Sequence, residues 1–366
     1  MRAAVLEEFG QPLVVQEVDL DEPKSGEVLV RLLACGVCHT DLYTASGADP
    51  SGYSPTVLGH EGAGVVEQVG PEVSSVAPGD HVVTLFSPQC RECVHCLSDR
   101  TNLCLAIREQ QNQGYLPDGT TRLGRDGEPI RHFMGCSTFA EYTVLPEIAL
   151  AKVTPEAPPE HACLFACGLS TGLGAAMNTA KVQAGSTCVV FGAGMVGLGA
   201  VVGCRLQGAE RIISVDLAPD RLALATAQGA TETLVGGPAI VDEILELTGG
   251  LGADYTFEAT GDVGVMRQAV ESARMGWGLC TIAGVAGKGE VLEVVPRFLI
   301  TGRRVAGSSF GGVKGRDQVP ELVERALAGE IDVAAFVSHR IRLDDVNHAF
   351  ELMEAQDGIR SVIEFP

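Results

Sequence analysis

The chain has 366 residues, of which 46% are hydrophobic and 20% are charged, and its formal net charge at pH 7 is −21. This length exceeds the size at which one hydrophobic core usually stops growing, so we expect two domains. The strong acidic balance argues against nucleic acids and anionic membranes as partners and fits a solvated acidic surface. No apolar run approaches the roughly 20 residues that a membrane-spanning helix needs.

The cysteine content indicates a reducing compartment. The first five residues, Met1–Val5, look like a strand and lack the apolar region of a signal peptide. Twelve cysteines in a chain without an export signal favour metal ligands and buried thiols over disulfides. We therefore expect a cytoplasmic protein.

The first 85 residues show short strands and turns without sustained helical periodicity. Strands are expected at 28–33 and 64–70, and a turn at 76–80 leads into another strand. This part of the chain is predicted to be mostly β, as a barrel or a sandwich.

The next segment, 86–136, is polar, rich in cysteine and expected to form loops. A strand is expected at 139–144, followed by a proline-rich connector over 145–159. From about residue 162 helices and strands alternate, which predicts a parallel, doubly wound α/β sheet.

Four closely spaced cysteines lie within the polar segment. They follow the pattern C-x2-C-x2-C-x7-C and are Cys90, Cys93, Cys96 and Cys104. Four thiolates suit a tetrahedral zinc ion, and a site without an open position is structural. An iron–sulfur cluster is the alternative, but the bacterial ferredoxin run has three residues before its last cysteine and a proline after it. A metal-free loop is the remaining, weaker alternative.

Three dispersed residues form a second candidate metal site. Cys38 lies in CGVCHTD, His60 in GHEGAG and Cys167 in ACGLSTG. Two thiolates and one imidazole would leave a fourth position open, as in a catalytic zinc site. Spacing alone does not join them, because a lone cysteine is often an inert buried residue and His60 could belong to a turn.

A dinucleotide site is predicted between Thr187 and Asp216. An apolar strand runs into G-x-G-x-x-G, a small-residue helix follows, and a second strand ends on an acid. The glycines permit a tight turn and close approach of a pyrophosphate, and the acid can accept hydrogen bonds from the adenosine ribose. Because Asp216 would repel a 2′-phosphate, the predicted coenzyme is NAD rather than NADP.

Further elements follow in the α/β region and beyond it. Helices are expected at 220–228, 240–247 and 343–355. Strands are expected at 253–258, 278–283, 304–306 and 361–365. Because the last strand resembles the β pattern of the opening region, we expect the chain to return to its first domain.

Together these motifs resemble one family. GHEGAGVVEQVG, CGVCHTD, the four-cysteine loop, CGLSTG and FGAGMVG are similar to the zinc-dependent medium-chain alcohol dehydrogenases. YTASGADPSG, LPDGTTRL, GCSTFAEYTV, MNTAKVQAGSTC and GRRVAGSSFGG resemble class III of that family, the S-(hydroxymethyl)glutathione or formaldehyde dehydrogenases.

The resemblance implies a mostly β, GroES-like catalytic domain built from both chain ends and a Rossmann coenzyme domain between them. The expected limits are 1–168 and 310–366 for the catalytic domain and 169–309 for the coenzyme domain. The resemblance also implies two zinc ions per chain: a catalytic ion on Cys38, His60 and Cys167, and a structural ion in the four-cysteine loop.

The family implies roles for residues around the catalytic zinc. Zinc would act as a Lewis acid on an alcohol or an aldehyde. Thr40 matches the hydroxyl that passes on the alcohol proton, and Asp41 matches a carboxylate that orients the zinc-bound imidazole. Glu61 is an acid that can approach the metal. Tyr43 replaces the relay histidine of class I enzymes, so the proton is expected to leave from Thr40 to the ribose or to solvent.

The expected coenzyme contacts come from both predicted domains. They are His39, Thr171, Gly192, Gly194, Met195, Val196, Gly197, Asp216, Arg221, Val285 and Arg360. His39 and Arg360 match positions that contact the pyrophosphate, and Arg221 matches one beside the adenosine ribose.

The expected substrate contacts are Arg122, Asp49 and Tyr43. Arg122 matches an arginine that holds the carboxylate of a glutathione adduct, with an ordinary surface arginine as the alternative. Ser51 and Ala306 replace a glutamate and a lysine of the family pattern. We therefore expect weaker binding of thiol adducts than in typical class III enzymes and more room for uncharged alcohols.

The predicted function is NAD-dependent oxidation of a primary alcohol or an S-hydroxymethyl thiol adduct by a cytoplasmic homodimer. Alternatives are a general aliphatic or aryl alcohol dehydrogenase and a non-catalytic NAD-binding zinc protein. A quinone reductase on the same scaffold is a further alternative, but it would not keep seven zinc ligands.

Overall fold

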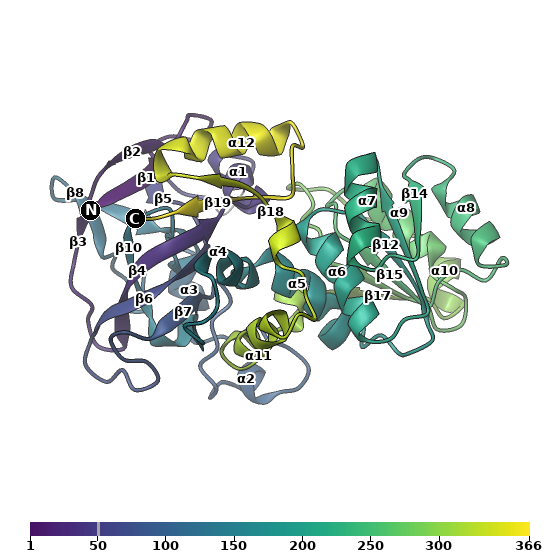
Figure 1. The fold of residues 1–366 in the computed structure, drawn as a ribbon, viewed down its shortest axis with the longest axis horizontal. Helices are drawn as coiled ribbons and strands as arrows, with labels where there is room; N and C mark the ends of the chain where they lie inside the picture. Colours follow the sequence, from purple (N-terminus) through teal and green to yellow (C-terminus); the bar gives the residue numbers. More distant parts are fainter. Residues whose placement is uncertain (50–51) are drawn as a thin grey trace. The chain divides into compact units, whose positions relative to one another are not determined.

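The computed structural model describes residues 1–49 and 52–366. It divides into two compact units, one made of Met1–Cys167 and Lys314–Pro366 and the other of Gly168–Val313 (Figure 1). The second unit is therefore one continuous insertion into the first. The boundaries expected from the sequence fell after residues 168 and 309, whereas the units divide after Cys167 and Val313.

The first unit contains two β-sheets. A six-stranded sheet has the order β2-β1-β5-β9-β8-β3, and a seven-stranded sheet has the order β11-β7-β6-β4-β19-β18 with β10 paired to β4. The strands are β1 (Arg2–Leu6), β2 (Val14–Glu17), β3 (Asp19–Leu20), β4 (Glu27–Gly36), β5 (Thr56–Val57), β6 (Glu61–Val69), β7 (His81–Thr84), β8 (Leu123–Arg125), β9 (Glu128–His132), β10 (Tyr142–Pro146), β11 (Leu150–Val153), β18 (Val337–Ile341) and β19 (Arg360–Glu364).

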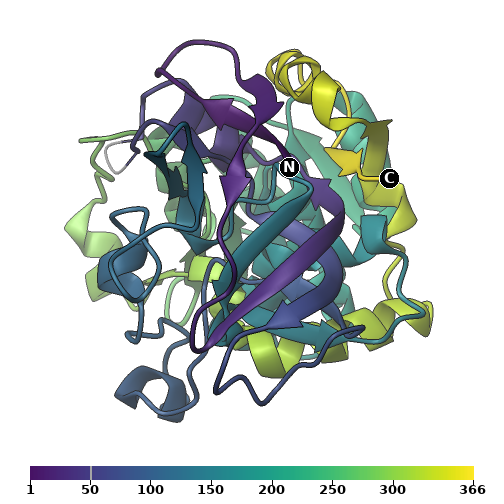
Figure 2. The ribbon, with the colours of Figure 1, turned by 90° about the vertical axis from the view of Figure 1, so that its left-hand side faces the viewer.

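Strand β4 organises the larger sheet. Its ten residues, EVLVRLLACG, have mostly buried side chains, and Val28, Val30 and Leu32 pack into a core with Val66 and Leu145. It pairs with β6 and also with β10, beside which it lies in Figure 2. Its end pairs with β19, the last strand of the chain, which confirms the predicted return of the chain to its opening region.

The helices of the first unit are short, apart from two in the returning part. They are α1 (His39–Ala45), α2 (Val94–Leu97), α3 (Arg108–Gln111), α4 (Pro159–Ala162), α11 (Gly315–Leu327) and α12 (Val346–Glu354). Short 3₁₀ turns include η1 (Phe133–Gly135), η3 (Cys163–Ala166) and η7 (Leu343–Asp345).

Three sequence expectations in this unit need correction. Helix α1 lies in the part predicted to lack helices, α2, α3, β8 and β9 lie in the predicted loop segment, and β11 lies in the predicted connector. Helix α1 has no apolar periodicity because its buried residues are Asp41, Thr44 and Ala45, and Asp41 closes a capping box at its start. Four-residue helices are likewise too short for a periodic signal.

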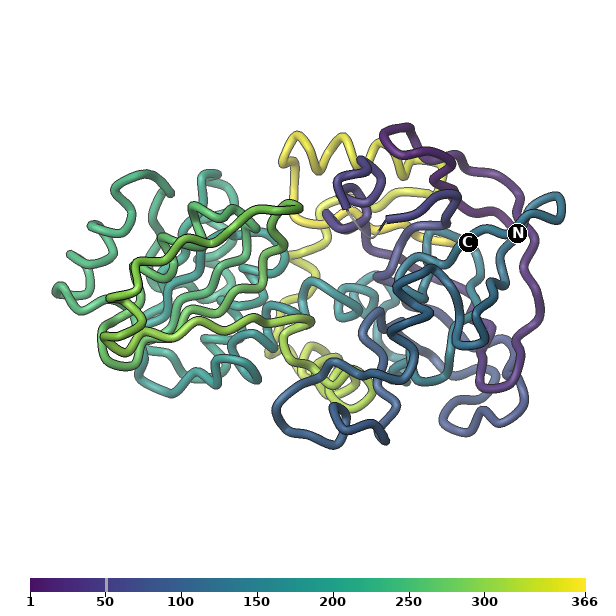
Figure 3. The backbone as a smooth tube through the Cα atoms, turned by 180° about the vertical axis from the view of Figure 1, so that it is seen from behind, coloured from purple at the N-terminus to yellow at the C-terminus, as the bar shows by residue number. Residues whose placement is uncertain are grey.

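The second unit is a parallel sheet with helices. Its strand order is β14-β13-β12-β15-β16-β17, with all neighbours parallel, and the tubes of these strands run side by side in Figure 3. The strands are β12 (Thr187–Phe191), β13 (Arg211–Asp216), β14 (Glu232–Val235), β15 (Tyr255–Glu258), β16 (Leu279–Ile282) and β17 (Arg304–Gly307). The helices include α5 (Gly168–Gly174), α6 (Met195–Leu206), α7 (Pro219–Gln228), α8 (Ile240–Leu247), α9 (Val263–Ser272) and α10 (Pro296–Ile300).

This order is the Rossmann arrangement, in which successive strands are added to one side of β12 and then to the other. Strand β12 is buried along Cys188–Phe191, as expected for a strand covered on both faces. Helix α7 begins with Pro219 and is followed by the capping residue Gly229, whose φ of 118° suits a residue without a side chain. Local sequence rules and the global fold therefore agree here.

Candidate metal centres and coenzyme site

Four potential metal ligands of the first unit converge. One ligand atom each from Cys38, His60, Glu61 and Cys167 lies within 4.8 Å of the other three. Cys38 directly precedes α1, His60 directly precedes β6, which begins at Glu61, and Cys167 directly follows the η3 turn. The dispersed residues that spacing could not join are thus brought together by the pairing of β4 with β6 and by the η3 turn.

Asp41 is a buried carboxylate that organises this cluster. Its Oδ2 accepts a hydrogen bond from the Cys38 amide at 2.9 Å, and its Oδ1 lies 3.0 Å from His60 Nδ1 and accepts from the Gly59 amide at 3.2 Å. Because Nδ1 faces Asp41, the other ring nitrogen, Nε2, is directed elsewhere. Nε2 is buried and has no hydrogen-bond partner among the described residues. A metal ion fits this arrangement, since it would satisfy Nε2 while the carboxylate orients the ring.

The sulfur atoms of the cluster suit metal binding. A hydrogen bond from Cys167 lowers the pKa of the Cys38 thiol well below its ordinary value against the effect of burial, and the charges of Arg360 and His60 assist. The thiolate is the form that binds metals. The Oγ1 of Thr40 lies 3.7 Å from the Cys38 sulfur, so a hydroxyl stands beside the predicted site.

Glu61 and Arg360 form a buried ion pair next to the cluster. Arg360 Nη2 lies 3.2 Å from Glu61 Oε1, and Nη1 donates to the Val37 carbonyl at 2.6 Å. Burial raises the pKa of Glu61 to about 7, although the charge of Arg360 opposes the shift. The family resemblance predicts that Arg360 contacts the coenzyme pyrophosphate, and this contact stays a prediction. The structure shows that Arg360 pairs with Glu61.

The four-cysteine loop forms a second cluster. The sulfur atoms of Cys90, Cys93, Cys96 and Cys104 all lie within 4.8 Å of one another, and those of Cys90 and Cys96 are 3.8 Å apart. A tetrahedron with zinc–sulfur bonds of about 2.3 Å has edges of about 3.8 Å, so the spacing fits one zinc ion.

Backbone amides point at these sulfurs. The Cys93 amide donates to Cys90 at 3.2 Å, and the Cys96 amide donates to Cys93 at 3.4 Å. Burial opposes ionisation of Cys93, but backbone hydrogen bonds from Leu105 and Cys96 lower its pKa to about 6. The loop is thus prepared for thiolates before any ion is bound.

Residues at the start of α11 form hydrogen bonds with the four-cysteine loop and with the residues just before it. Lys314 Nζ donates to the carbonyls of Cys96 at 2.8 Å and Ser98 at 2.7 Å. Asp317 accepts hydrogen bonds from Gln89 and Arg91. The sequence does not reveal these contacts, because Lys314 and Asp317 lie more than 200 positions from the cysteines and no local pattern relates them.

The glycine turn of the predicted coenzyme site directly follows β12. Gly192 has a φ of 90°, and a Cβ atom on Gly197 would lie 1.7 Å from the Gly192 carbonyl oxygen. A Cβ atom on Gly194 would meet nothing within 4 Å, which leaves room beside the start of α6. This turn fits a pyrophosphate at the helix N-terminus.

Asp216 ends β13 as predicted. Its Oδ2 accepts from the Ala193 amide at 2.6 Å and its Oδ1 from the Ala218 amide at 2.9 Å, so the carboxylate is held beside the glycine turn. Met195 and Val196 open α6, Arg221 lies on α7, Thr171 is buried on α5, and Val285 is 75% exposed after β16. Their roles at the coenzyme stay predictions, as does that of the exposed His39 in the first unit.

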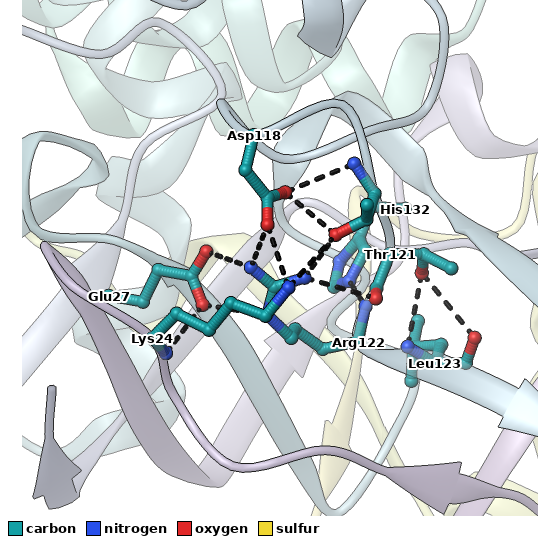
Figure 4. A network of polar contacts seen from close by, with 8 residues as sticks. Lys24, Glu27, Asp118, Thr121, Arg122, Leu123 and His132 are labelled. Atoms are coloured by element: carbon teal, nitrogen blue, oxygen red, sulfur yellow. Dashed lines mark hydrogen bonds and ion pairs between the residues drawn. The ribbon is translucent and has the colours of Figure 1, made fainter.

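The prediction that Arg122 binds a substrate carboxylate is wrong. Its side chain is fully buried, and all five N–H donors already have acceptors (Figure 4). Nε and Nη2 donate to the two carboxylate oxygens of Glu27, Nη2 also donates to Asp118, and Nη1 donates to Thr120 and to the Thr121 carbonyl. The alternative of a solvated surface arginine is wrong as well, because Arg122 anchors its loop to the start of β4.

The other expected substrate residues stay predictions. Tyr43 is partly buried on α1, and Asp49 accepts a hydrogen bond from Thr44 at 2.8 Å. Ser51 lies outside the described residues. Ala306 lies on β17 in the second unit.

A Rossmann unit inserted into a β-rich unit with one open and one closed cluster of metal ligands defines a zinc-dependent dehydrogenase. Residues 24–155 match the alcohol dehydrogenase GroES-like domain, and residues 195–328 match the zinc-binding dehydrogenase domain. The chain belongs to the zinc-dependent alcohol dehydrogenase family. Within that family it is similar to the class III enzymes, the S-(hydroxymethyl)glutathione dehydrogenases.

Curated relatives and solved structures agree with this assignment. The chain is 51% identical to S-(hydroxymethyl)glutathione dehydrogenase of Escherichia coli O1:K1, over 100% of this chain and 99% of the relative. An alcohol dehydrogenase zinc-binding domain protein from Burkholderia ambifaria is 36% identical with a TM-score of 0.94, over 100% and 98% of the two chains. Benzyl alcohol dehydrogenase from Acinetobacter calcoaceticus is 30% identical with a TM-score of 0.92, over 100% and 99%.

As a member of this family, the chain is an oxidoreductase that uses zinc and NAD. In the part of the chain that the structure describes, no helix combines the length and the apolar character needed to cross a membrane.

Proposed function

We propose that this chain oxidises S-hydroxymethyl thiol adducts and other primary alcohols with NAD, at a zinc ion held by Cys38, His60 and Cys167. The observation that carries the proposal is the buried cluster in which His60 Nε2 has no hydrogen-bond partner among the described residues while Asp41 holds Nδ1. The 51% identity to an S-(hydroxymethyl)glutathione dehydrogenase over the whole chain supports the thiol adduct as a substrate.

Each residue of the proposed catalytic site has a separate role. When bound, zinc would supply Lewis-acid polarisation of the substrate oxygen, and NAD would accept the hydride. Thr40, whose Oγ1 lies 3.7 Å from the Cys38 sulfur, would take the alcohol proton and pass it toward solvent. Asp41 keeps the imidazole in one tautomer and orientation. Arg360 offsets the negative charge of Glu61 and of the two thiolates in a buried site.

The second zinc ion is proposed for Cys90, Cys93, Cys96 and Cys104, with a structural role. Its support is the closed set of four sulfurs and the amide hydrogen bonds directed at them. A four-thiolate site keeps no position for substrate.

The competing proposal is a general aliphatic or aryl alcohol dehydrogenase. It is supported by the full-length similarity to a benzyl alcohol dehydrogenase and by the replacement of an acid and a base of the class III pattern by Ser51 and Ala306. A substrate panel with NAD separates the two proposals. It contains benzyl alcohol, octanol, and formaldehyde with and without glutathione.

The panel has a clear expected result. We expect turnover of all the alcohols and a higher rate with formaldehyde when glutathione is present. Turnover of benzyl alcohol and octanol with no effect of glutathione would favour the general dehydrogenase. No turnover of any alcohol by zinc-loaded protein would contradict both proposals and favour a non-catalytic NAD-binding protein.

We further propose a cytoplasmic homodimer. All twelve cysteines are free thiols or belong to the metal clusters, which suits a reducing compartment. The edge strand β17 offers unpaired backbone groups, and Leu299, Ile300 and Val305 near it are 47%, 83% and 39% exposed. An apolar edge of this kind fits pairing with a second copy across a two-fold axis.

A further inference from the structure

A buried carboxylate lies at the end of a central strand of the second unit. Glu258 is the last residue of β15, and its side chain is fully buried. Its Oε1 accepts three hydrogen bonds, from the Thr260 hydroxyl at 2.5 Å, from the Thr260 amide at 2.6 Å and from the Gly261 amide at 2.9 Å. One oxygen atom therefore closes the turn that follows β15. We call residues 259–261 the β15 turn.

The β15 turn packs against the first glycine of the predicted coenzyme site. A Cβ atom on Gly192 would lie 2.8 Å from Thr260 Cγ2 and 3.3 Å from the carbonyl oxygen of Ala259. The Ala259 amide donates to the Phe191 carbonyl at 2.9 Å. Because Gly192 opens the G-x-G-x-x-G turn, the β15 turn fixes the position of that glycine from one side.

The same turn packs against the segment that follows β16. A Cβ atom on Gly261 would lie 2.5 Å from the Val285 carbonyl oxygen. A Cβ atom on Gly284 would lie 2.3 Å from the Gly261 amide nitrogen and 2.5 Å from Glu258 Oε2. This second carboxylate oxygen is buried and has no hydrogen-bond partner among the described residues. Glu258 thus orders a turn that contacts both Gly192 and Val285, two predicted coenzyme residues.

The β15 turn lies where a doubly wound sheet binds its ligand. Strand β12 has β13 on one side and β15 on the other, so the direction in which strands are added reverses between β12 and β15. In such sheets the ligand binds outside the carboxyl ends of the strands at this reversal. The coenzyme turn follows β12, and the β15 turn follows the neighbouring strand. Both turns therefore lie at the edge of the sheet where this rule places the coenzyme.

The burial of this acid is costly. Burial raises the pKa of Glu258, hydrogen bonds from Thr260 and Gly261 oppose the shift, and the charge of Asp262 adds to it. A turn can be closed at lower cost by an exposed Asp or Ser side chain. Acids with a raised pKa are concentrated at functional sites. The cost fits a residue that serves the adjacent coenzyme turn as well as the fold.

We infer that Glu258 is a positioning residue for the coenzyme: through the β15 turn it holds the predicted coenzyme residues Gly192 and Val285 in the arrangement that binds NAD. Glu258 acts through these residues and is not itself a catalytic residue. The inference concerns the coenzyme and applies with any alcohol, so it goes beyond the proposed function.

The test compares variants of two residues of β15. Glu258→Ala removes the acceptor of three hydrogen bonds, Glu258→Asp withdraws it by one methylene group, and Glu258→Gln keeps an oxygen that can accept them. Thr256→Val is the matched control, because Thr256 is equally buried but its hydroxyl donates to the Ala269 carbonyl on α9. The measurements are NADH binding followed by fluorescence, thermal melting, and kinetics with NAD and benzyl alcohol.

The expected effect is selective for the coenzyme. Loss of hydrogen bonds to a charged group should raise the Kd for NADH and the KM for NAD of Glu258→Ala about tenfold to a hundredfold. The KM for benzyl alcohol at saturating NAD should stay within about twofold, because the zinc ligands lie outside this network. Glu258→Asp should also bind NADH more weakly, and Glu258→Gln should recover most of the affinity. Thr256→Val should bind NADH like the wild type although it melts earlier.

Three results would overturn the inference. They are wild-type NADH binding in both Glu258→Ala and Glu258→Asp, equally weak binding in Glu258→Gln and Glu258→Ala, and weakened binding in Thr256→Val to the same extent. Failure of the proposed function looks different, because the wild type would then oxidise no alcohol while the NADH titrations would still separate Glu258→Ala from Thr256→Val.

Discussion

Asp41 fixes His60: the carboxylate oxygen Oδ1 lies 3.0 Å from Nδ1 of the imidazole, and both side chains are buried. The contact leaves Nε2 as the nitrogen available to a metal. It also ties a residue of α1 to the residue that precedes the body of β6, so one acid serves the helix start and the imidazole.

Asp41→Asn should therefore weaken the catalytic zinc site while sparing the structural one. Loss of a carboxylate behind a metal-bound histidine lowers metal affinity by about tenfold to a hundredfold. Dialysis against a chelator followed by elemental analysis should show faster loss of one of the two zinc ions. Equal retention of both ions by variant and wild type would contradict the role of Asp41.

The two zinc clusters should respond differently to loss of a ligand. Cys38→Ser should abolish turnover and leave a folded protein with one zinc ion. Cys96→Ser should lower thermal stability first, because its loop has few core contacts and depends on the ion. Melting curves with parallel activity assays check this prediction, and equal loss of fold in both variants would be the contrary result.

Asp216 should select NAD over NADP. Asp216→Gly removes the ribose acceptor and a negative charge, so the ratio of kcat/KM for NAD to that for NADP should fall. Because Asp216 also accepts from the Ala193 amide, KM for NAD should rise as well. The exposed Asp220 on α7 is a matched control, since Asp220→Gly changes the charge equally. The same ratio in Asp216→Gly as in the wild type would show that another residue selects the coenzyme.

Arg122 should matter for stability rather than for substrate. Breaking a buried ion pair by removing one partner costs about 3–5 kcal/mol, so Arg122→Leu should lower the free energy of unfolding by that order. The double variant Glu27→Gln/Arg122→Leu should be less unstable than the sum of the single variants. Urea unfolding of the three proteins is the measurement, and near-wild-type stability of Arg122→Leu would disprove the assignment.

The same network predicts a pH effect. Burial opposes the shift, but hydrogen bonds from Lys24, Thr120 and Arg122 lower the pKa of Asp118. A lowered carboxyl pKa stabilises the folded state above the ordinary value of about 4, and this stabilisation is lost as the pH falls further. Asp118→Asn should therefore flatten the stability profile on the acid side, as unfolding at a series of pH values would show.

The dimer prediction concerns β17. Solution scattering should give the mass of two chains, and Ile300→Lys should shift the protein toward the monomer, because Ile300 is 83% exposed next to the edge strand. A tetramer, or a dimer unaffected by Ile300→Lys, would refute this interface.

Local patterns predicted the central part of the coenzyme unit, but not β14, α9 or α10. The turn from Gly192 to Gly197, the acid at Asp216 and the helix over 240–247 all depend on neighbouring residues, and the structure reproduces them. The four-cysteine loop could be predicted for the same reason. The site at Cys38, His60 and Cys167 needed family resemblance, because a pairing between distant strands brings its residues together.

Arg122 shows where such resemblance fails. A motif places a residue in a segment, but it does not show which acceptors the folded chain offers. Here the carboxylate of Glu27, 95 positions earlier, accepts hydrogen bonds from both Nε and Nη2 of the Arg122 guanidinium. Helix α1 was missed for a related reason, since its buried side chains are polar and give no apolar period.

The division of the chain has a practical consequence. The first unit ends at Cys167, a predicted zinc ligand, and resumes at Lys314, which holds two carbonyls of the four-cysteine loop. The chain therefore leaves and re-enters the first unit at residues that belong to, or contact, a predicted metal site. The second unit, 168–313, is one uninterrupted segment that could be exchanged as a cassette. Transplanting that cassette from a relative with another coenzyme preference should leave both sets of zinc ligands intact, which makes the chain a suitable recipient for exchanging cofactor specificity in a single segment.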